Sequence, residues 1–194
     1  MYIREMHTLW FRRRLVYGCI LGIFVWLLFR HKNYTIKFEA VIDKSKPIEV
    51  WEYVADFSNM KKLNPTILDF SVEEESGNYK HWKYTVHYTE FLSYMPFIHN
   101  FARASFEVRP LTATSYIVES SHQTCFFTLY TCVDSSSKFV FEPETSRNGT
   151  KCTESVTYGC PIILYKFCEQ EVWYQRKEII TNLQREFYIK NKLA

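Results

Sequence analysis

The chain has 194 residues, enough for one sizeable hydrophobic core, and it is 47% hydrophobic and 18% aromatic with only 5 glycines and 6 prolines. This composition excludes a disordered chain, a linker-rich chain and a disulfide-stapled mini-protein. Six of the 24 lysines and arginines, but only one of the 21 acids, lie in residues 1–32. The rest of the chain is therefore slightly acidic, and we predict no nucleic-acid partner.

The first predicted element is an apolar helix at Leu15–Phe29, a run without charged residues between Arg12–Arg14 and Arg30–Lys32. No small-residue cleavage site follows it, which favours an uncleaved signal anchor over a cleaved signal peptide or a buried helix. The run spans roughly 22 Å, so crossing a hydrocarbon core of about 30 Å would need snorkelling bases and local thinning. We predict a basic segment and single-pass transmembrane anchor at 1–32, in an endomembrane such as the endoplasmic reticulum, and one domain at 33–194. Bases flank the run about equally, so the side of the membrane stays open.

Two N-glycosylation sequons occur, Asn33-Tyr34-Thr35 and Asn148-Gly149-Thr150. The first lies next to the predicted anchor, where the glycosylation machinery reaches poorly. The Asn-Gly pair of the second is also typical of a type I′ hairpin turn. The sequons therefore do not decide the sidedness.

Of the six cysteines, Cys19 lies in the apolar run and an odd number remains. We interpret Cys125, Cys132, Cys152 and Cys160 as small apolar residues in strands, with a disulfide set in an oxidising compartment as the alternative. There is no CxxC pair and no Cys/His cluster with zinc-ligand spacing, so we predict no metal and no cofactor.

Beyond residue 33, apolar and polar residues alternate with the period of half-buried strands. Ile36, Phe38, Ala40 and Ile42 share one face of the first predicted strand. A helix is predicted from Pro47, followed by a second short helical turn that ends before Pro65. Further strands are predicted near 67–75, 80–92, 100–109, 114–123, 126–133, 137–143 and 150–159.

The period becomes helical after Pro161 and predicts a long amphipathic C-terminal helix. Its apolar stripe includes Val172, Ile179 and Leu183, with Glu171 and Arg176 assigned to other faces. The order of elements indicates an α+β fold with an antiparallel sheet packed on this helix.

The segment Pro47-Ile48-Glu49-Val50-Trp51-Glu52-Tyr53-Val54-Ala55-Asp56-Phe57, followed by Leu63-Asn64-Pro65, resembles the opening of the START-like (SRPBCC) superfamily, which includes polyketide cyclase-like and coenzyme Q-binding proteins. With the element order, the resemblance covers about residues 35–190. It implies a helix-grip fold, in which a curved antiparallel sheet wraps around a long C-terminal helix. It also implies an apolar cavity for lipids, sterols, quinones or other hydrophobic ligands. Most members of the superfamily bind or carry such ligands, and a minority catalyse.

The alternation places several aromatic and polar side chains on inward strand faces, with Glu90 among them. We predict that the aromatic ones and the helix stripe hold a ligand tail, while inward polar groups hold its head group. The alternative is that bulges or strand ends turn the polar groups to water. The apolar connection at 92–100 is a candidate cavity lid, membrane-facing edge or packed loop. The predicted ligand-binding residues are Tyr84, Tyr88, Phe106, Tyr116, Ser120, His122, Glu154, Cys168 and Val172.

We therefore predict membrane-anchored binding or transfer of a lipid, sterol or similar hydrophobic molecule. One alternative is a cyclase- or isomerase-type enzyme that uses an inward Glu or His, and another is a non-binding adaptor whose interior is filled by its own aromatics. The sequence lacks GxSxG, HExxH, Walker and GxGxxG motifs, and strand parity places His81 and His87 on a solvated face. These observations favour binding over catalysis.

Overall fold

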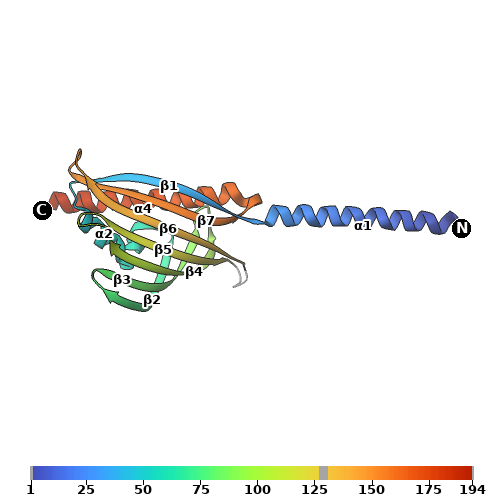
Figure 1. Ribbon diagram of the computed structural model, residues 1–194, viewed down its shortest axis with the longest axis horizontal. Helices are drawn as coiled ribbons and strands as arrows, with labels where there is room; N and C mark the ends of the chain where they lie inside the picture. The colour runs from blue at the N-terminus through green and yellow to red at the C-terminus, as the bar shows by residue number, and fades with distance from the viewer. Residues whose placement is uncertain (1, 127–130, 194) are drawn as a thin grey trace.

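We describe the protein from a computed structural model that covers residues 2–126 and 131–193. In this part of the chain, strands form one 7-stranded antiparallel sheet in the order β1-β7-β6-β5-β4-β3-β2 (Figure 1). The strands are β1 (His31–Asp43), β2 (Ile67–Asn78), β3 (His81–Leu92), β4 (Met95–Pro110), β5 (Tyr116–Phe126), β6 (Thr131–Glu144) and β7 (Gly149–Pro161). The helices are α1 (Tyr2–Phe29), α2 (Pro47–Ala55), α3 (Phe57–Leu63), the 3₁₀ turn η1 (Ile162–Leu164) and α4 (Tyr165–Leu193).

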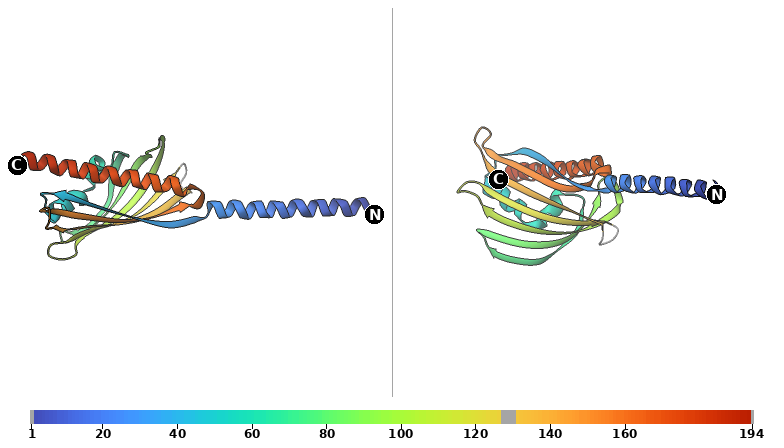
Figure 2. Two further views of the ribbon diagram at one scale, coloured as in Figure 1. Left: turned by 90° about the horizontal axis from the view of Figure 1, so that it is seen from above. Right: turned by 45° about the vertical axis from the view of Figure 1, so that its right-hand side comes forward.

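The sheet curves around α4, with α2 and α3 filling part of the same concave side (Figure 2). The main core lies between these three helices and the inner sheet face. On α4 it includes Ile179, Leu183 and Phe187. The predicted α+β architecture of a curved sheet wrapped around a long C-terminal helix is confirmed.

The short helices begin where local chemistry favours them. Pro47 occupies the start of α2, where its missing N–H costs no hydrogen bond. Asp56 caps α3 by accepting a hydrogen bond from the Ser58 backbone N–H at 2.9 Å. Asn64 follows α3, and its side chain accepts from the backbone N–H of Thr66 at 3.2 Å. Both helices predicted from the sequence are therefore confirmed.

Two predicted strand boundaries are wrong. The structure has one strand β6 in place of the pieces 126–133 and 137–143, and residues 127–130 lie outside the described residues. A run of serines in β6 interrupts the alternation of apolar and polar residues that predicts a strand. The backbone of this run nevertheless pairs with the strands on both sides, as in His122↔Ser135 and Ser135↔Tyr158. Similarly, β4 begins at Met95, so the connection predicted at 92–100 is mostly strand.

The apolar run lies in α1, which extends away from the domain (Figure 1). Among the described residues, no helix has enough continuous apolar length to cross a membrane. The predicted transmembrane helix is therefore not supported. The physical reason is that Leu15–Phe29 reaches only about 22 Å at 1.5 Å per residue, and extending it towards the N-terminus brings in Arg12–Arg14.

The interpretation of the strand cysteines as unpaired apolar residues is wrong for three of the four. Cys125 and Cys132 lie opposite each other on β5 and β6, with Cα atoms 4.0 Å apart, and form a disulfide. Cys160, at the end of β7, is bonded to Cys168 in the first turns of α4. Cys152 is buried and free, as expected of a small core residue. Strand periodicity does not show that the first turns of α4 lie against the end of β7, which is what brings Cys168 to Cys160.

Candidate functional site

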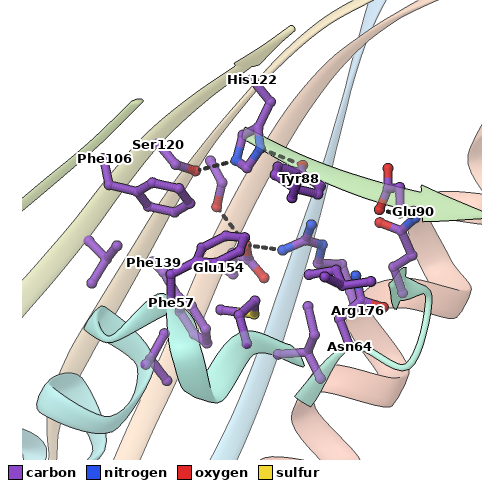
Figure 3. Close-up of a pocket in the computed structure, with 17 residues that line it drawn as sticks. Phe57, Asn64, Tyr88, Glu90, Phe106, Ser120, His122, Phe139, Glu154 and Arg176 are labelled. Atoms are coloured by element: carbon purple, nitrogen blue, oxygen red, sulfur yellow. Dashed lines mark hydrogen bonds and ion pairs between the residues drawn. The ribbon is translucent and has the colours of Figure 1, made fainter. Parts of the chain in front are cut away.

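A cavity of about 50 Å³ lies inside the domain, between the concave sheet face, α3 and α4 (Figure 3). Its wall combines the aromatic rings of Phe57, Tyr88, Phe106 and Phe139 with several polar side chains. A single water needs at least about 10–15 Å³ by the same measure, whereas pockets for drug-sized molecules are about 300–1,000 Å³. In this conformation, the cavity therefore has room for a small polar group or a few waters.

An ion pair between the buried Glu154 and the partly buried Arg176 forms one side of the cavity. Glu154 on β7 is 2% exposed, and its Oε1 accepts from Arg176 Nη1 at 2.8 Å and from the Ser137 hydroxyl at 2.5 Å. Within the described residues, Glu154 Oε2 and Arg176 Nε have no hydrogen-bond partner. An unpaired buried polar atom costs about 1–3 kcal/mol, more when charged. This pair can therefore take a further hydrogen bond from a polar group in the cavity.

His122 lies above this ion pair and connects two hydroxyl groups (Figure 3). Its Nδ1 is 2.9 Å from the Tyr88 hydroxyl, and its Nε2 is 2.8 Å from Ser120 Oγ. Burial, assisted by the positive charge of Arg176, lowers the pKa of His122 to about 3. The ring is therefore neutral at physiological pH, with one nitrogen donating and the other accepting.

Glu90 adds a second buried carboxyl group. Burial, followed by the negative charge of Glu171, raises the pKa of Glu90 to about 7. The Gln175 amide donates to Glu90 at 3.4 Å and to Glu171 at 3.2 Å. Glu171 also accepts from the Ser93 backbone N–H at 3.0 Å and from its hydroxyl at 2.6 Å. The hydrogen bonds between Glu171 and Ser93 connect α4 to the β3–β4 turn.

Five of the nine predicted ligand-binding residues meet at this cavity: Tyr88, Phe106, Ser120, His122 and Glu154. Strand parity found them because alternate residues of a strand face the same side.

The other four predicted residues lie elsewhere. The Tyr84 hydroxyl donates to the Ala55 carbonyl at 2.7 Å, and Tyr116 stacks on Trp51 at 4.8 Å. Both are covered by α2, which fills that part of the concave face. Cys168 is disulfide-bonded, and Val172 packs beside it in a separate cluster.

Two further residues that line the cavity, Arg176 and Glu90, are not among the nine predicted ligand-binding residues, although Glu90 is predicted to face inward. The helical pattern assigns Arg176 and Glu171 to faces other than the apolar stripe of α4, yet Glu171 is 7% exposed and Arg176 pairs with Glu154. A signal was present, because Arg176 lies four residues after Val172 and three before Ile179, and is therefore in register with the apolar stripe. A charged residue in that position predicts a buried partner.

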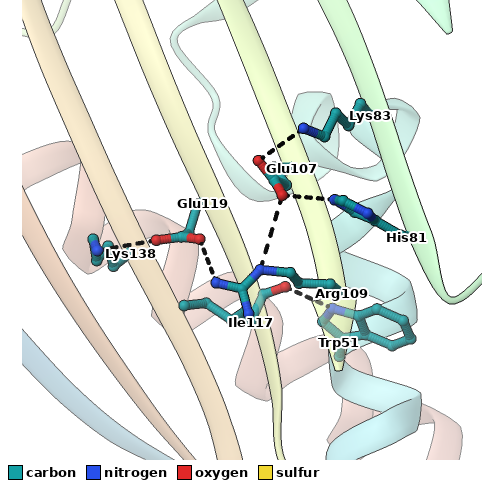
Figure 4. Close-up of polar contacts among 8 residues, drawn as sticks. All are labelled: Trp51, His81, Lys83, Glu107, Arg109, Ile117, Glu119 and Lys138. Atoms are coloured by element: carbon teal, nitrogen blue, oxygen red, sulfur yellow. Dashed lines mark hydrogen bonds and ion pairs between the residues drawn. The ribbon is translucent and has the colours of Figure 1, made fainter. Parts of the chain in front are cut away.

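The outer face of the sheet carries a separate, exposed network of charges (Figure 4). Glu107 lies 2.6 Å from His81 and 3.3 Å from Lys83, while Glu119 pairs with Arg109 at 2.8 Å and with Lys138 at 3.0 Å. Hydrogen bonds from these neighbours lower the pKa of both glutamates. Such exposed pairs contribute little stability each.

The predicted solvated position of His81 and His87 is confirmed, with both side chains about half exposed. In the described part of the chain, no group of His, Cys, Asp and Glu side chains is arranged to hold a metal ion.

No protein-family model and no curated protein matches the sequence. Among solved structures, the lipid transfer and protein localization domain of human StarD13 is similar, with a TM-score of 0.56 and 10% identity over 80% of this chain and 76% of that one. The protein TTHA0849 from Thermus thermophilus has a TM-score of 0.56 and 14% identity over 81% of this chain and 99% of its own. Ara h 8.0201 has a TM-score of 0.50 and 15% identity over 81% and 99%. The chain therefore has the START-like helix-grip fold that the sequence resemblance implies.

Proposed function

We propose that the protein binds an amphiphilic hydrophobic ligand, a lipid or sterol, with its polar end beside Glu154 and Arg176. The observation that carries the proposal is the free Oε2 of a buried carboxylate at the floor of an aromatic cavity. A ligand hydroxyl that donates to Glu154 Oε2 would complete the hydrogen bonding of the site. The apolar part of the ligand then packs among Phe57, Tyr88 and Phe106.

The small cavity requires the domain to open for uptake. A lipid needs several hundred Å³, so α4 has to move away from the inner sheet face. The contacts that hold this part of α4 include those of Glu171 with Ser93, of Gln175 with Glu90 and of Arg176 with Glu154. In this proposal they break on entry, and α4 stays displaced while the ligand is bound, because the closed cavity of about 50 Å³ is too small to hold it.

Binding is favoured over general acid–base catalysis because the charge of Glu154 and both ring nitrogens of His122 already have partners. Arg176 neutralises Glu154, and both nitrogens of His122 are within hydrogen-bond distance of hydroxyl groups. A second candidate function, a non-binding adaptor, is favoured by the cavity of only about 50 Å³. Ligand titration separates these two functions.

We further propose that α1 holds the domain at a lipid bilayer. Its side chains Tyr17, Leu21 and Trp26 are 70%, 63% and 63% exposed. An apolar surface that covers a helix on all sides is stabilised by contact with hydrocarbon. The arginines on either side of Leu15–Phe29 are placed to reach lipid phosphates.

The test of ligand binding is native mass spectrometry of the full chain in mild detergent, together with titration of a fluorescent sterol and a fluorescent phospholipid. We expect co-purifying lipid and saturable binding. Glu154→Gln weakens binding by about tenfold to a hundredfold, the value of a hydrogen bond to a charged group. The matched control, Glu39→Gln on the exposed face of β1, leaves binding unchanged.

Glu154→Gln also leaves Arg176 without its charged partner. A second variant therefore changes the cavity without altering a charged residue. Val118 lines the cavity, and Val118→Leu adds a methylene group there. We expect Val118→Leu to weaken binding while circular dichroism stays that of the wild type. No saturable binding by correctly folded wild-type protein would exclude the ligand and leave the adaptor.

A further inference from the structure

We infer that the START-like domain lies in an oxidising compartment of the secretory pathway and that Asn148 is N-glycosylated there. The inference is independent of the ligand proposed above. It joins two observations from different parts of the fold, the pairing of the cysteines and the position of the second sequon.

Both disulfides lie at the end of the domain nearest α1. Cys125–Cys132 joins β5 to β6, and Cys160–Cys168 joins β7 to α4. Cys125 and Cys132 are only partly buried, so a reducing cytosol would have access to this bond. Disulfides of this kind persist in the endoplasmic reticulum lumen and outside the cell, and are rare in the cytosol.

The sequon lies in the β6–β7 turn, at the end of the sheet opposite α1. Asn148 is exposed and has φ +46°, while the next residue, Gly149, pairs with Asp43 at the far end of β1. Since β1 has 13 residues, this turn lies about 40 Å along the strand from the end of α1. A glycan on Asn148 therefore extends into solvent without meeting the sheet or a membrane at α1.

The fold also explains when the modification takes place. Thr150 is fully buried, and its hydroxyl accepts from the Ser45 hydroxyl at 2.9 Å. The sequon threonine is therefore out of reach once β7 has paired with β1. Transfer has to occur while the chain enters the lumen, before the domain folds.

The reaction is a glycosyl transfer from a polyprenyl-diphosphate-linked oligosaccharide, supplied by the host membrane. The Asn148 Nδ2 forms a bond to the anomeric carbon of the first sugar, and the bond from that carbon to the diphosphate oxygen breaks. The diphosphate leaves with the electron pair, and the amide proton passes to a base of the transferase. No oxidation or reduction takes place.

The other sequon provides an internal comparison. Asn33 is the third residue of β1, four positions after α1 ends at Phe29. With α1 at the bilayer, Asn33 lies too close to the membrane for the transferase. We therefore expect one glycan per chain, on Asn148.

The test expresses the full chain in human cells and compares its gel mobility before and after treatment with peptide N-glycosidase F. We expect a shift by one oligosaccharide that Asn148→Asp abolishes and Asn33→Asp retains. Aspartate tolerates a positive φ, so Asn148→Asp keeps the turn. No shift in the wild type, or a shift lost only in Asn33→Asp, would overturn the assignment of Asn148.

A second measurement tests the compartment without relying on the glycan. Denatured protein from the same cells is treated with a polyethylene-glycol maleimide, with and without prior reduction. We expect two adducts without reduction, on Cys19 and Cys152, and adducts on all 6 cysteines after it. Six adducts without reduction would place the domain in a reducing compartment and overturn the inference.

Discussion

At the scale of single residues, Glu90 and His122 titrate in opposite senses. Between pH 4.5 and about 7 the folded protein keeps a proton on Glu90 that the unfolded chain has released, so stability falls as pH rises. Below pH 6.5 the unfolded chain binds a proton at His122. The folded protein keeps His122 neutral down to about pH 3, so this residue makes stability fall as pH falls. The two effects oppose each other between pH 4.5 and 6.5.

The first prediction is that single variants uncover these opposed slopes. Glu90→Gln retains the amide contacts but removes the titration, so its stability rises with pH from 4.5 to 6.5 relative to the wild type. His122→Asn shows the reverse, with stability falling as pH rises over the same window. Urea denaturation of the full chain in mild detergent measures both. Profiles of both variants parallel to the wild type would show that neither group has the pKa assigned to it.

The second prediction concerns the buried ion pair. Arg176→Met leaves the carboxylate of Glu154 buried without its charged partner and costs about 3–5 kcal/mol in the free energy of unfolding. The double variant Glu154→Leu with Arg176→Met recovers most of this loss, because no uncompensated charge remains. Thermal and urea unfolding of the single and double variants form the test.

A matched control is Lys138→Met, which breaks the exposed pair with Glu119 and costs less than about 1 kcal/mol. A double variant as unstable as Arg176→Met alone would show that packing of the arginine stem, and not its charge, stabilises this region.

At the scale of elements, α4 closes the domain through a narrow stripe. Leu183 is fully buried against the main core, whereas Thr181, two residues earlier, is exposed. Val172 is only partly buried, in the separate cluster beside the Cys160–Cys168 disulfide. The two ends of α4 therefore contribute differently to stability.

The third prediction is that Leu183→Asp unfolds the domain, because it buries an unpaired carboxylate at a cost of several kcal/mol. Val172→Asp costs less, since its side chain can reach water at the end of the sheet. Thr181→Asp places the same group on the exposed face and leaves the melting temperature nearly unchanged. Equal melting temperatures for Leu183→Asp and Thr181→Asp would contradict the observed orientation of α4.

At the scale of the whole molecule, α1 and the domain differ in where their apolar side chains lie. The domain buries its apolar side chains in its own core, while those of α1 point outward all along Leu15–Phe29. In the described part of the chain, the main contact of α1 with the domain is the one with η1. The proposed association with lipid is therefore assigned to this one segment.

The fourth prediction, which rests on the membrane role proposed for α1, is that the full chain co-sediments with phospholipid vesicles, whereas a chain beginning at Asn33 stays in the supernatant. Leu21→Arg places a charge in the apolar run and weakens this association, while Thr35→Arg, outside the apolar run, has no effect. Full chain recovered in the supernatant would refute a membrane role for α1.

The sequence by itself determined the order of the helices and of most strands, although not the single strand β6, together with the inward faces of several strands. Periods of 2 and 3.6 residues are local properties, so Tyr88, Phe106 and His122 could be placed on one face without a tertiary structure. The start of α2 at Pro47 followed in the same way from the restricted φ of proline.

Only the tertiary structure decided which inward residues meet. Glu154 and Arg176 are 22 positions apart, and their pairing depends on how α4 crosses β7. The same packing of layers brings Cys168 to Cys160, covers Tyr84 and Tyr116 with α2, and leaves a cavity of about 50 Å³. A residual volume is the small difference between a large interior space and the side chains that fill it, and no local pattern of residues encodes that difference.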